Sequence, residues 1–194
     1  MTAALWTSAD AAAATGGRAT ATWAASGVSI DSRSVAAGDL FVALRGPTFD
    51  GHDFVPVALK AGAAAAVVGQ TPGGVADTAA LLMVDDTQAA LEALARAARD
   101  RATGRLVAIT GSVGKTGTKE MLALALTAVA GDRTAVHASR SSHNNQIGVP
   151  LTLANLPREA TYGVFELGMN HAGEITPLTR LVRPHVAAIT TVEA

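Results

Sequence analysis

Short apolar runs alternate along this chain with segments of helix-forming residues. Apolar or alternating runs indicate strands over residues 28–32, 40–44, 64–68, 81–84, 106–109, 134–136, 162–167 and 186–192. Helical patterns begin after Thr7 or Ser8 and after Asp85 or Asp86, and cover residues 54–61, 119–126, 147–156 and 174–182. Alternating strands and helices predict an α/β fold with a mainly parallel sheet and right-handed crossovers.

A candidate domain boundary lies at Thr103-Gly104, because a buried type of strand begins immediately afterwards. We therefore predict a small α/β domain over residues 1–103 and a second α/β domain over residues 104–194. Polar, glycine-containing loops are expected over residues 46–53 and 139–146.

The most informative motif follows the strand at residues 106–109 and precedes a helical segment. In this setting backbone N–H groups and a helix N-terminus converge on a phosphate, a lysine adds positive charge, and a threonine hydroxyl faces magnesium. Ile109 stands where the general pattern has a glycine, so a chance Gly-Lys-Thr at a helix start is the alternative. The predicted loop, which we call the phosphate loop, consists of Gly111, Ser112, Val113, Gly114, Lys115, Thr116 and Gly117. It indicates a protein that uses ATP or GTP.

Glu166 ends an apolar strand, where an unpaired carboxylate is costly to bury. Ligands of open parallel sheets bind beyond the carboxyl ends of the strands, so we expect Glu166 near the phosphate loop and in contact with magnesium or nucleotide. Pairing with an arginine is the alternative. His171 and Glu174 are three residues apart and too few for a zinc site. They equally suit a helix start with Asn170 as its cap.

Two further polar segments could contact a substrate. Asn144-Asn145 lies in a polar loop, where asparagines also serve purely local hydrogen bonding. Asp31-Ser32-Arg33 offers a hydroxyl and a cation to a phosphate, or forms an ordinary surface ion pair. The loop from Gly46 to His52 could close over a ligand or be a simple turn.

Composition narrows the class of protein. There is no cysteine, which excludes disulfides and thiolate metal sites. The 15 Lys and Arg nearly balance the 16 Asp and Glu, and no basic block stands out, so nucleic acid is not an expected partner. No secretory signal or membrane span is recognisable. We expect a soluble, cytoplasmic, monomeric protein.

Taken together and in this order, these segments resemble the Mur ligase family, the ATP-dependent enzymes that build the peptidoglycan stem peptide. In the first half the resemblance rests on Asp31-Ser32-Arg33 and on residues 38–44 and 50–54. In the second half it rests on the phosphate loop and on residues 144–152 and 166–175. Within the family these segments are most similar to the member that joins D-alanyl-D-alanine to UDP-N-acetylmuramoyl-tripeptide.

The resemblance implies peptide-bond formation driven by ATP hydrolysis. The substrate's terminal carboxylate takes the γ-phosphoryl group, and the amine of D-alanyl-D-alanine attacks the acyl phosphate. It further implies that Lys115 neutralises phosphate charge and that Thr116 and Glu166 hold Mg²⁺. The residues implied for the uridine-nucleotide substrate are Ser32, Arg33, Pro47, Thr48 and Phe49, with Asn144 and Asn145 near its sugar.

Two departures from the family pattern adjoin the phosphates: Val113 replaces a usual asparagine or serine, and Gly117 a usual threonine or serine. The family pattern continues past Ala194 with a metal-binding histidine, a carbamylated lysine, the rest of the central sheet and a third domain. We therefore expect this chain to be the N-terminal part of a ligase, truncated inside its ATP-binding domain and inactive in ligation by itself. A sheet cut in this way is also expected to expose edges and apolar faces in the second half of the chain.

Three alternatives stay open. The nearest is the family member that adds the third stem-peptide residue, which shares the Asp-Ser-Arg and Asp-Gly-His segments. A kinase or GTPase with the same type of loop is a second, although no Asn-Lys-x-Asp guanine signature is present. The third is a non-catalytic module that binds a uridine nucleotide.

Overall fold

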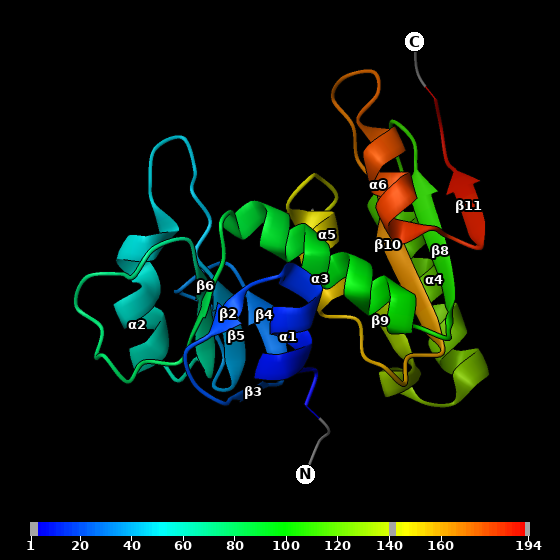
Figure 1. The fold of residues 1–194 in the computed structure, drawn as a ribbon. Coiled ribbons are helices and arrows are strands. Elements are labelled where there is room, and N and C mark those ends of the chain that lie inside the picture. The colour runs from blue at the N-terminus through cyan, green and yellow to red at the C-terminus, as the bar shows by residue number, and fades with distance from the viewer. Residues whose placement is uncertain (1–3, 140–142, 193–194) are drawn as a thin grey trace. The chain divides into compact units, whose positions relative to one another are not determined.

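The computed structural model describes residues 4–139 and 143–192. The chain divides into two compact units, Met1–Leu94 and Ala95–Ala194, and the division falls inside helix α3 (Thr87–Arg101). The domain bounds of 1–103 and 104–194 stay a prediction. Each unit contains its own sheet (Figure 1), and each is described separately below.

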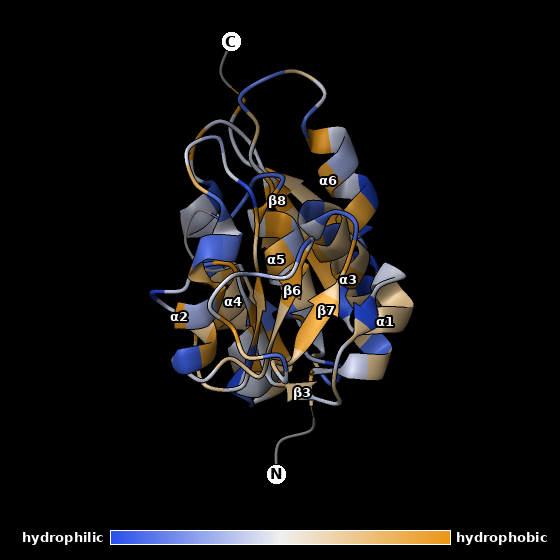
Figure 2. Cartoon of the chain, turned by 60° about the vertical axis from the view of Figure 1, so that its left-hand side comes forward, coloured by the Kyte–Doolittle hydropathy of each residue, from blue (hydrophilic) through white to orange (hydrophobic). Residues whose placement is uncertain are grey.

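The first unit is built on a five-stranded sheet with the order β2-β7-β6-β5-β4. Strands β4 to β7 are parallel, and β2 joins the edge antiparallel to β7. Strand β6 is apolar along its whole length (Figure 2), and all of its residues are buried, as is typical of a parallel strand that is covered on both faces. The strands are β2 (Arg18–Ala19), β4 (Gly27–Ser29), β5 (Asp39–Val42), β6 (Ala65–Val68) and β7 (Leu81–Met83), and a separate antiparallel pair is formed by β1 (Trp6–Thr7) and β3 (Ala24–Ala25).

Side-chain caps begin two helices, α1 (Ser8–Thr15) and α3, where the sequence predicts them. The Thr7 hydroxyl accepts the N–H of Asp10 and starts α1. The Asp86 carboxylate accepts two N–H groups, at 2.7 and 2.9 Å, and starts α3. The remaining helical segments are the 3₁₀ turn η1 (Gly51–Phe54) and α2 (Val55–Lys60).

The second unit contains a fully parallel four-stranded sheet with the order β11-β8-β10-β9. Its strands are β8 (Arg105–Thr110), β9 (Val136–Ala138), β10 (Tyr162–Glu166) and β11 (Val186–Ile189). Its helical segments are α4 (Lys115–Ala130), η2 (Arg133–Ala135), α5 (Gly148–Ala154) and α6 (Ile175–Val182). Strands alternate with helices, which confirms the predicted α/β class with a mainly parallel sheet.

Helices pack on both faces of the second sheet at strands β8 and β10 (Figure 1). Helices α5 and α6 pack with the strands into one apolar core that includes Leu106, Leu153, Phe165 and Leu178. Helix α4 packs on β8, β9 and β10. Its outward side chains Met121, Leu124 and Val129 are exposed, as are Val186 and Ile189 of β11. The predicted exposure of apolar faces in the second half is therefore present in this structure.

Three predicted strands differ most from the structure. The first ends at Ser29 because the Asp31 carboxylate binds the Arg33 N–H and draws the chain into a turn. Residues 133–135 form η2, because Asp132 accepts both the N–H and the hydroxyl of Thr134. The last strand ends at Ile189 instead of Val192.

Among the described residues, no helix has the length and apolarity needed to cross a membrane.

Candidate functional site

The phosphate loop runs from the carboxyl end of β8 into the first turn of α4. Gly111 and Gly114 have φ values of +135° and +87°, a region that other residues rarely adopt, so glycine is required at both positions. Gly114 is the N-cap of α4 and provides no side-chain acceptor, so the first N–H groups of α4 are not capped by that residue. Strand, loop and helix are placed as the sequence predicts, and the geometry suits an anion at the helix N-terminus.

Lys115 lies against the loop that precedes it. Its ammonium group donates to the carbonyl oxygens of Gly111, at 2.6 Å, and Ser112, at 3.1 Å. These contacts hold the positive charge beside the loop. A phosphate bound there would therefore meet both backbone N–H groups and a cation.

Glu166 ends β10 and is only 2% exposed. The Thr116 hydroxyl donates to its Oε2 at 3.0 Å, and the Asn144 amide donates to its Oε1 at 2.8 Å. The structure thus brings Glu166 to the phosphate loop, and within the described chain its side-chain partners are these two neutral groups rather than an arginine. A carboxylate beside a hydroxyl and an amide offers the hard oxygen ligands that Mg²⁺ prefers.

The two asparagines of the polar loop have different roles in the structure. The Asn145 side-chain oxygen Oδ1 accepts the N–H groups of Ile147 and Gly148 and so holds the start of α5. Asn144 instead points at Glu166, and its backbone carbonyl accepts the Gly168 N–H at 2.7 Å. A Cβ on Gly168 would lie 2.7 Å from the Asn144 Cγ, so Asn144 can reach Glu166 only because residue 168 is glycine. Gly168 was not predicted as a site residue from the sequence, although it lies only two residues after Glu166.

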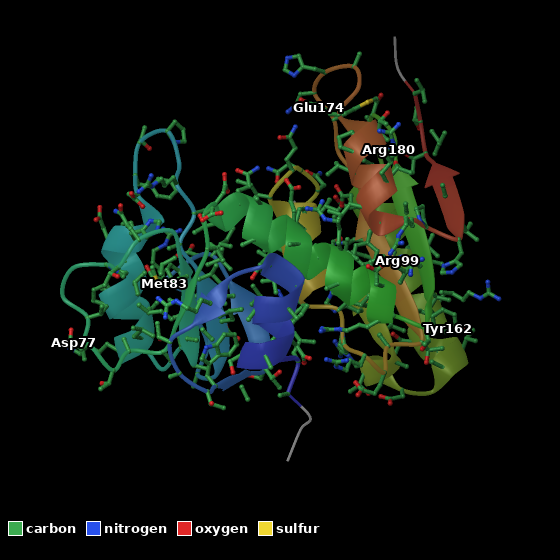
Figure 3. All side chains as sticks on the ribbon, in the orientation of Figure 1. Asp77, Met83, Arg99, Tyr162, Glu174 and Arg180 are labelled. Carbon is green, nitrogen blue, oxygen red and sulfur yellow. The ribbon has the colours of Figure 1, made fainter. Side chains whose placement is uncertain are left out.

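His171 contacts Glu174 through Nδ1 at 3.2 Å. Figure 3 shows Glu174 at the start of α6. The Glu174 carboxylate accepts the N–H groups of Asn170, at 2.7 Å, and His171, at 3.2 Å. These bonds, that of Asn170 first, lower the pKa of Glu174. The predicted cap at Asn170 is wrong, because Glu174 itself is the N-cap residue of α6. Among the described residues no group of three or more acidic, histidine or cysteine side chains could hold a metal.

In the first unit, Arg33 forms an ion pair with Asp31. The guanidinium and the carboxylate are joined by several contacts, the shortest being 2.6 Å from Nη2 to Oδ2. The side-chain bond from Arg33 is the main cause that lowers the pKa of Asp31 to about 2. The pair is exposed, and exposed pairs stabilise a fold by only ~0–1 kcal/mol, so Arg33 can exchange its carboxylate for a phosphate at little cost.

Replacing Arg33 by alanine should raise the pKa of Asp31 from about 2 toward 3.8. Because the pKa of Asp31 is lower in the folded than in the unfolded chain, the ion pair stabilises the fold fully at pH values above the unfolded pKa of ~3.9. This stabilisation disappears as the pH falls toward 2. A carboxyl NMR titration measures both midpoints. Arg45→Ala is the matched control, since Arg45 pairs with Asp50. An unchanged midpoint in Arg33→Ala would mean that the ion pair does not form in solution.

Pro47, Thr48 and Phe49 lie at the exposed tip of a short loop closed by a bridge between Arg45 and Asp50. The base of this loop is held by His52, which sequence reasoning missed. His52 is buried, receives the Gly69 N–H on Nε2 at 2.8 Å and contacts Asp50 through Nδ1 at 2.5 Å. Since Nε2 accepts, the ring proton lies on Nδ1 and is donated to Asp50.

Comparison with known proteins shows the family. Residues 24–99 match the model of the Mur ligase family, catalytic domain, and residues 109–194 match the Mur ligase middle domain. The chain is 42% identical to the UDP-N-acetylmuramoyl-tripeptide–D-alanyl-D-alanine ligase of Synechocystis sp., over 84% of this chain and 35% of that protein. It is 40% identical to the ligase of the same name from Bacillus subtilis, over 86% of this chain and 35% of the relative.

Solved structures agree with the sequence comparison. MurF from Acinetobacter baumannii matches 95% of this chain with a TM-score of 0.78 and 36% identity, and 40% of that protein is covered. MurF ligase from Thermotoga maritima in complex with ADP matches 85% of this chain with a TM-score of 0.64 and 30% identity, and 37% of that protein is covered. The chain thus spans between a third and two fifths of the length of these relatives. On both sequence and structure, the chain belongs to the Mur ligase family.

Proposed function

We propose that this chain is part of an ATP-dependent ligase that joins D-alanyl-D-alanine to UDP-N-acetylmuramoyl-tripeptide, in the synthesis of peptidoglycan precursors. The observation that carries the proposal is the contact between the Thr116 hydroxyl and the buried Glu166 carboxylate at the end of the phosphate loop. The names of the relatives supply the substrates.

The residues of the second unit fit Mg²⁺ and a nucleoside triphosphate. The Thr110 hydroxyl, beside the first glycine of the loop, is buried and has no hydrogen-bond partner within the described chain. Such a group is expected where a ligand or its water completes the site. The phosphate loop would hold the triphosphate, and Thr116 and Glu166 would hold Mg²⁺. Bound ATP supplies the phosphoryl group that activates the substrate carboxylate.

The protein's own side chains bind and orient the reactants. Lys115 neutralises phosphate charge, and Asn144 fixes the Glu166 carboxylate and presents its remaining polar atoms to the substrate. In the first unit, Ser32, Arg33 and the exposed loop of Pro47, Thr48 and Phe49 would bind the uridine diphosphate group. We assign Asn145 a local role at the start of α5 and His171 none in the chemistry.

The test is ligation by the full-length product of the gene that encodes this sequence. UDP-N-acetylmuramoyl-tripeptide, D-alanyl-D-alanine and Mg-ATP are supplied, and phosphate release is followed together with product mass. Product and phosphate in equal amounts support the proposal. Product formed only from a UDP-N-acetylmuramoyl-dipeptide and a single amino acid would assign the chain to the ligase of the preceding step. Binding without product would leave a nucleotide-binding module.

A further inference from the structure

The two residues that follow β11, Thr190 and Thr191, hold the phosphate loop by hydrogen bonds. The sequence assigns no function to this strand. Strand β11 lies beside β8 (Figure 1), and the ladder continues past Ile189 through the Thr190 N–H, which donates to the Thr110 carbonyl at 2.9 Å. The Thr190 hydroxyl then donates to the Val113 carbonyl at 2.6 Å. The Thr191 carbonyl accepts the Ser112 N–H, also at 2.6 Å. Two consecutive residues after β11 therefore hold both the start and the middle of the loop.

The approach of Thr190 to the loop is unusually close. A Cβ placed on Gly111 would lie 2.2 Å from the Thr190 hydroxyl oxygen and 3.0 Å from the Thr191 carbonyl oxygen. The first glycine of the loop is thus needed for its φ value and also for the room that Thr190 occupies. Val113 is 56% exposed, so packing of its side chain does not fix the middle of the loop.

We propose that Thr190 is a positioning residue for nucleotide binding, and this rests on the proposed function. A trans peptide unit is planar, so its C=O and N–H groups point in opposite directions. By holding the Val113 carbonyl toward β11, the Thr190 hydroxyl turns the N–H of Gly114 away from β11. Backbone donors that are already oriented bind a phosphate without the cost of ordering the loop.

Two substitutions isolate the hydroxyl. Thr190→Ser keeps it, Thr190→Ala removes it, and neither contains the γ-methyl group of threonine. We expect Thr190→Ala to weaken Mg-ATP binding about tenfold, as loss of one hydrogen bond predicts, and Thr190→Ser to stay within about twofold of the parent chain. Thr127→Ala is the matched control, because the Thr127 hydroxyl also donates to a backbone carbonyl, that of Ala123, in the last turns of α4.

A second measurement needs no nucleotide. Amide hydrogen exchange of Ser112 reports whether the loop remains bonded to Thr191, and we expect it to be about tenfold faster in Thr190→Ala than in Thr190→Ser. Exchange and affinity equal in the two variants would overturn the inference. Faster exchange in Thr190→Ala, with no Mg-ATP binding by the unsubstituted full-length protein, would keep the role of Thr190 in the loop and reject its role in nucleotide binding, along with the proposed nucleotide site.

Discussion

Replacement of Lys115 by alanine is expected to abolish ATP-dependent turnover by the full-length ligase that we propose and to leave uridine-nucleotide binding largely intact. Lys115 is the cation of the phosphate loop, held by the carbonyl groups of Gly111 and Ser112. In the function we propose, its loss removes the charge that offsets the phosphates as the phosphoryl group is transferred, so we expect kcat to fall by at least about 10³-fold, which abolishes turnover in practice. Phosphate release gives kcat, and calorimetric titration with the uridine-nucleotide substrate gives its Kd.

We expect turnover and uridine-nucleotide binding to respond separately because the residues proposed for them belong to different units of the chain. Lys115 belongs to the second unit, whereas Ser32 and Arg33 belong to the first. Arg33→Ala should therefore give the reverse result, weaker uridine-nucleotide binding with Mg-ATP affinity retained. Lys60→Ala, at an exposed position of α2, is the control for loss of a lysine. Equal loss of both ligands in Lys115→Ala would mean that the two sites are not separate.

The parts of the site that could be predicted depend on local patterns. The glycines, lysine and threonine of the phosphate loop follow one another in the chain, and the strand before them and the helix after them are visible as periodicity. Glu166 could be placed near the loop because parallel strands β8 and β10 end at the same edge of the sheet. Nothing beyond the element order was needed for that inference.

The parts that could not be predicted depend on contacts between distant residues. Thr190 lies 77 residues after Val113, and the bond between them depends on β11 pairing with β8, an order the sequence does not specify. Lys119 reads as an ordinary polar position of an amphipathic helix, yet it is completely buried. The ion pair of Asp31 and Arg33 is local, but sequence reasoning could not choose between it and a bound phosphate.

Lys119→Ala should be the most destabilising single substitution that we predict in the second unit. The Lys119 ammonium is fully buried, one turn of α4 after Thr116, and donates to the Ser139 carbonyl at 2.7 Å and to Glu120 at 2.8 Å. Truncation removes the donor, leaves the buried Ser139 carbonyl without it and opens a cavity. We expect the free energy of unfolding to fall by about 4 kcal/mol.

The single tyrosine makes this measurement specific to the second unit. Tyr162 lies on β10 (Figure 3), whereas both tryptophans, Trp6 and Trp23, lie in the first unit. Urea unfolding followed by ¹⁹F NMR of 3-fluorotyrosine at position 162 therefore reports on the second unit, and tryptophan fluorescence reports on the first. Lys119→Ala should shift the unfolding transition seen by ¹⁹F NMR and leave the transition seen by tryptophan fluorescence unchanged. Lys60→Ala should change neither by more than about 0.5 kcal/mol.

Lys119→Met separates the charge from the volume, because methionine is unbranched and nearly fills the same space but cannot donate. We expect a loss of about 2 kcal/mol, the cost of the unpaired Ser139 carbonyl without the cavity. The same substitution should also disturb Glu166 of the magnesium site that we propose, since the Ser139 hydroxyl accepts the Glu166 N–H at 3.2 Å.

If Lys119→Met is as stable as the unsubstituted chain, the expected loss of stability is contradicted. That result would mean that the cost of burying the ammonium cancels its hydrogen bonds.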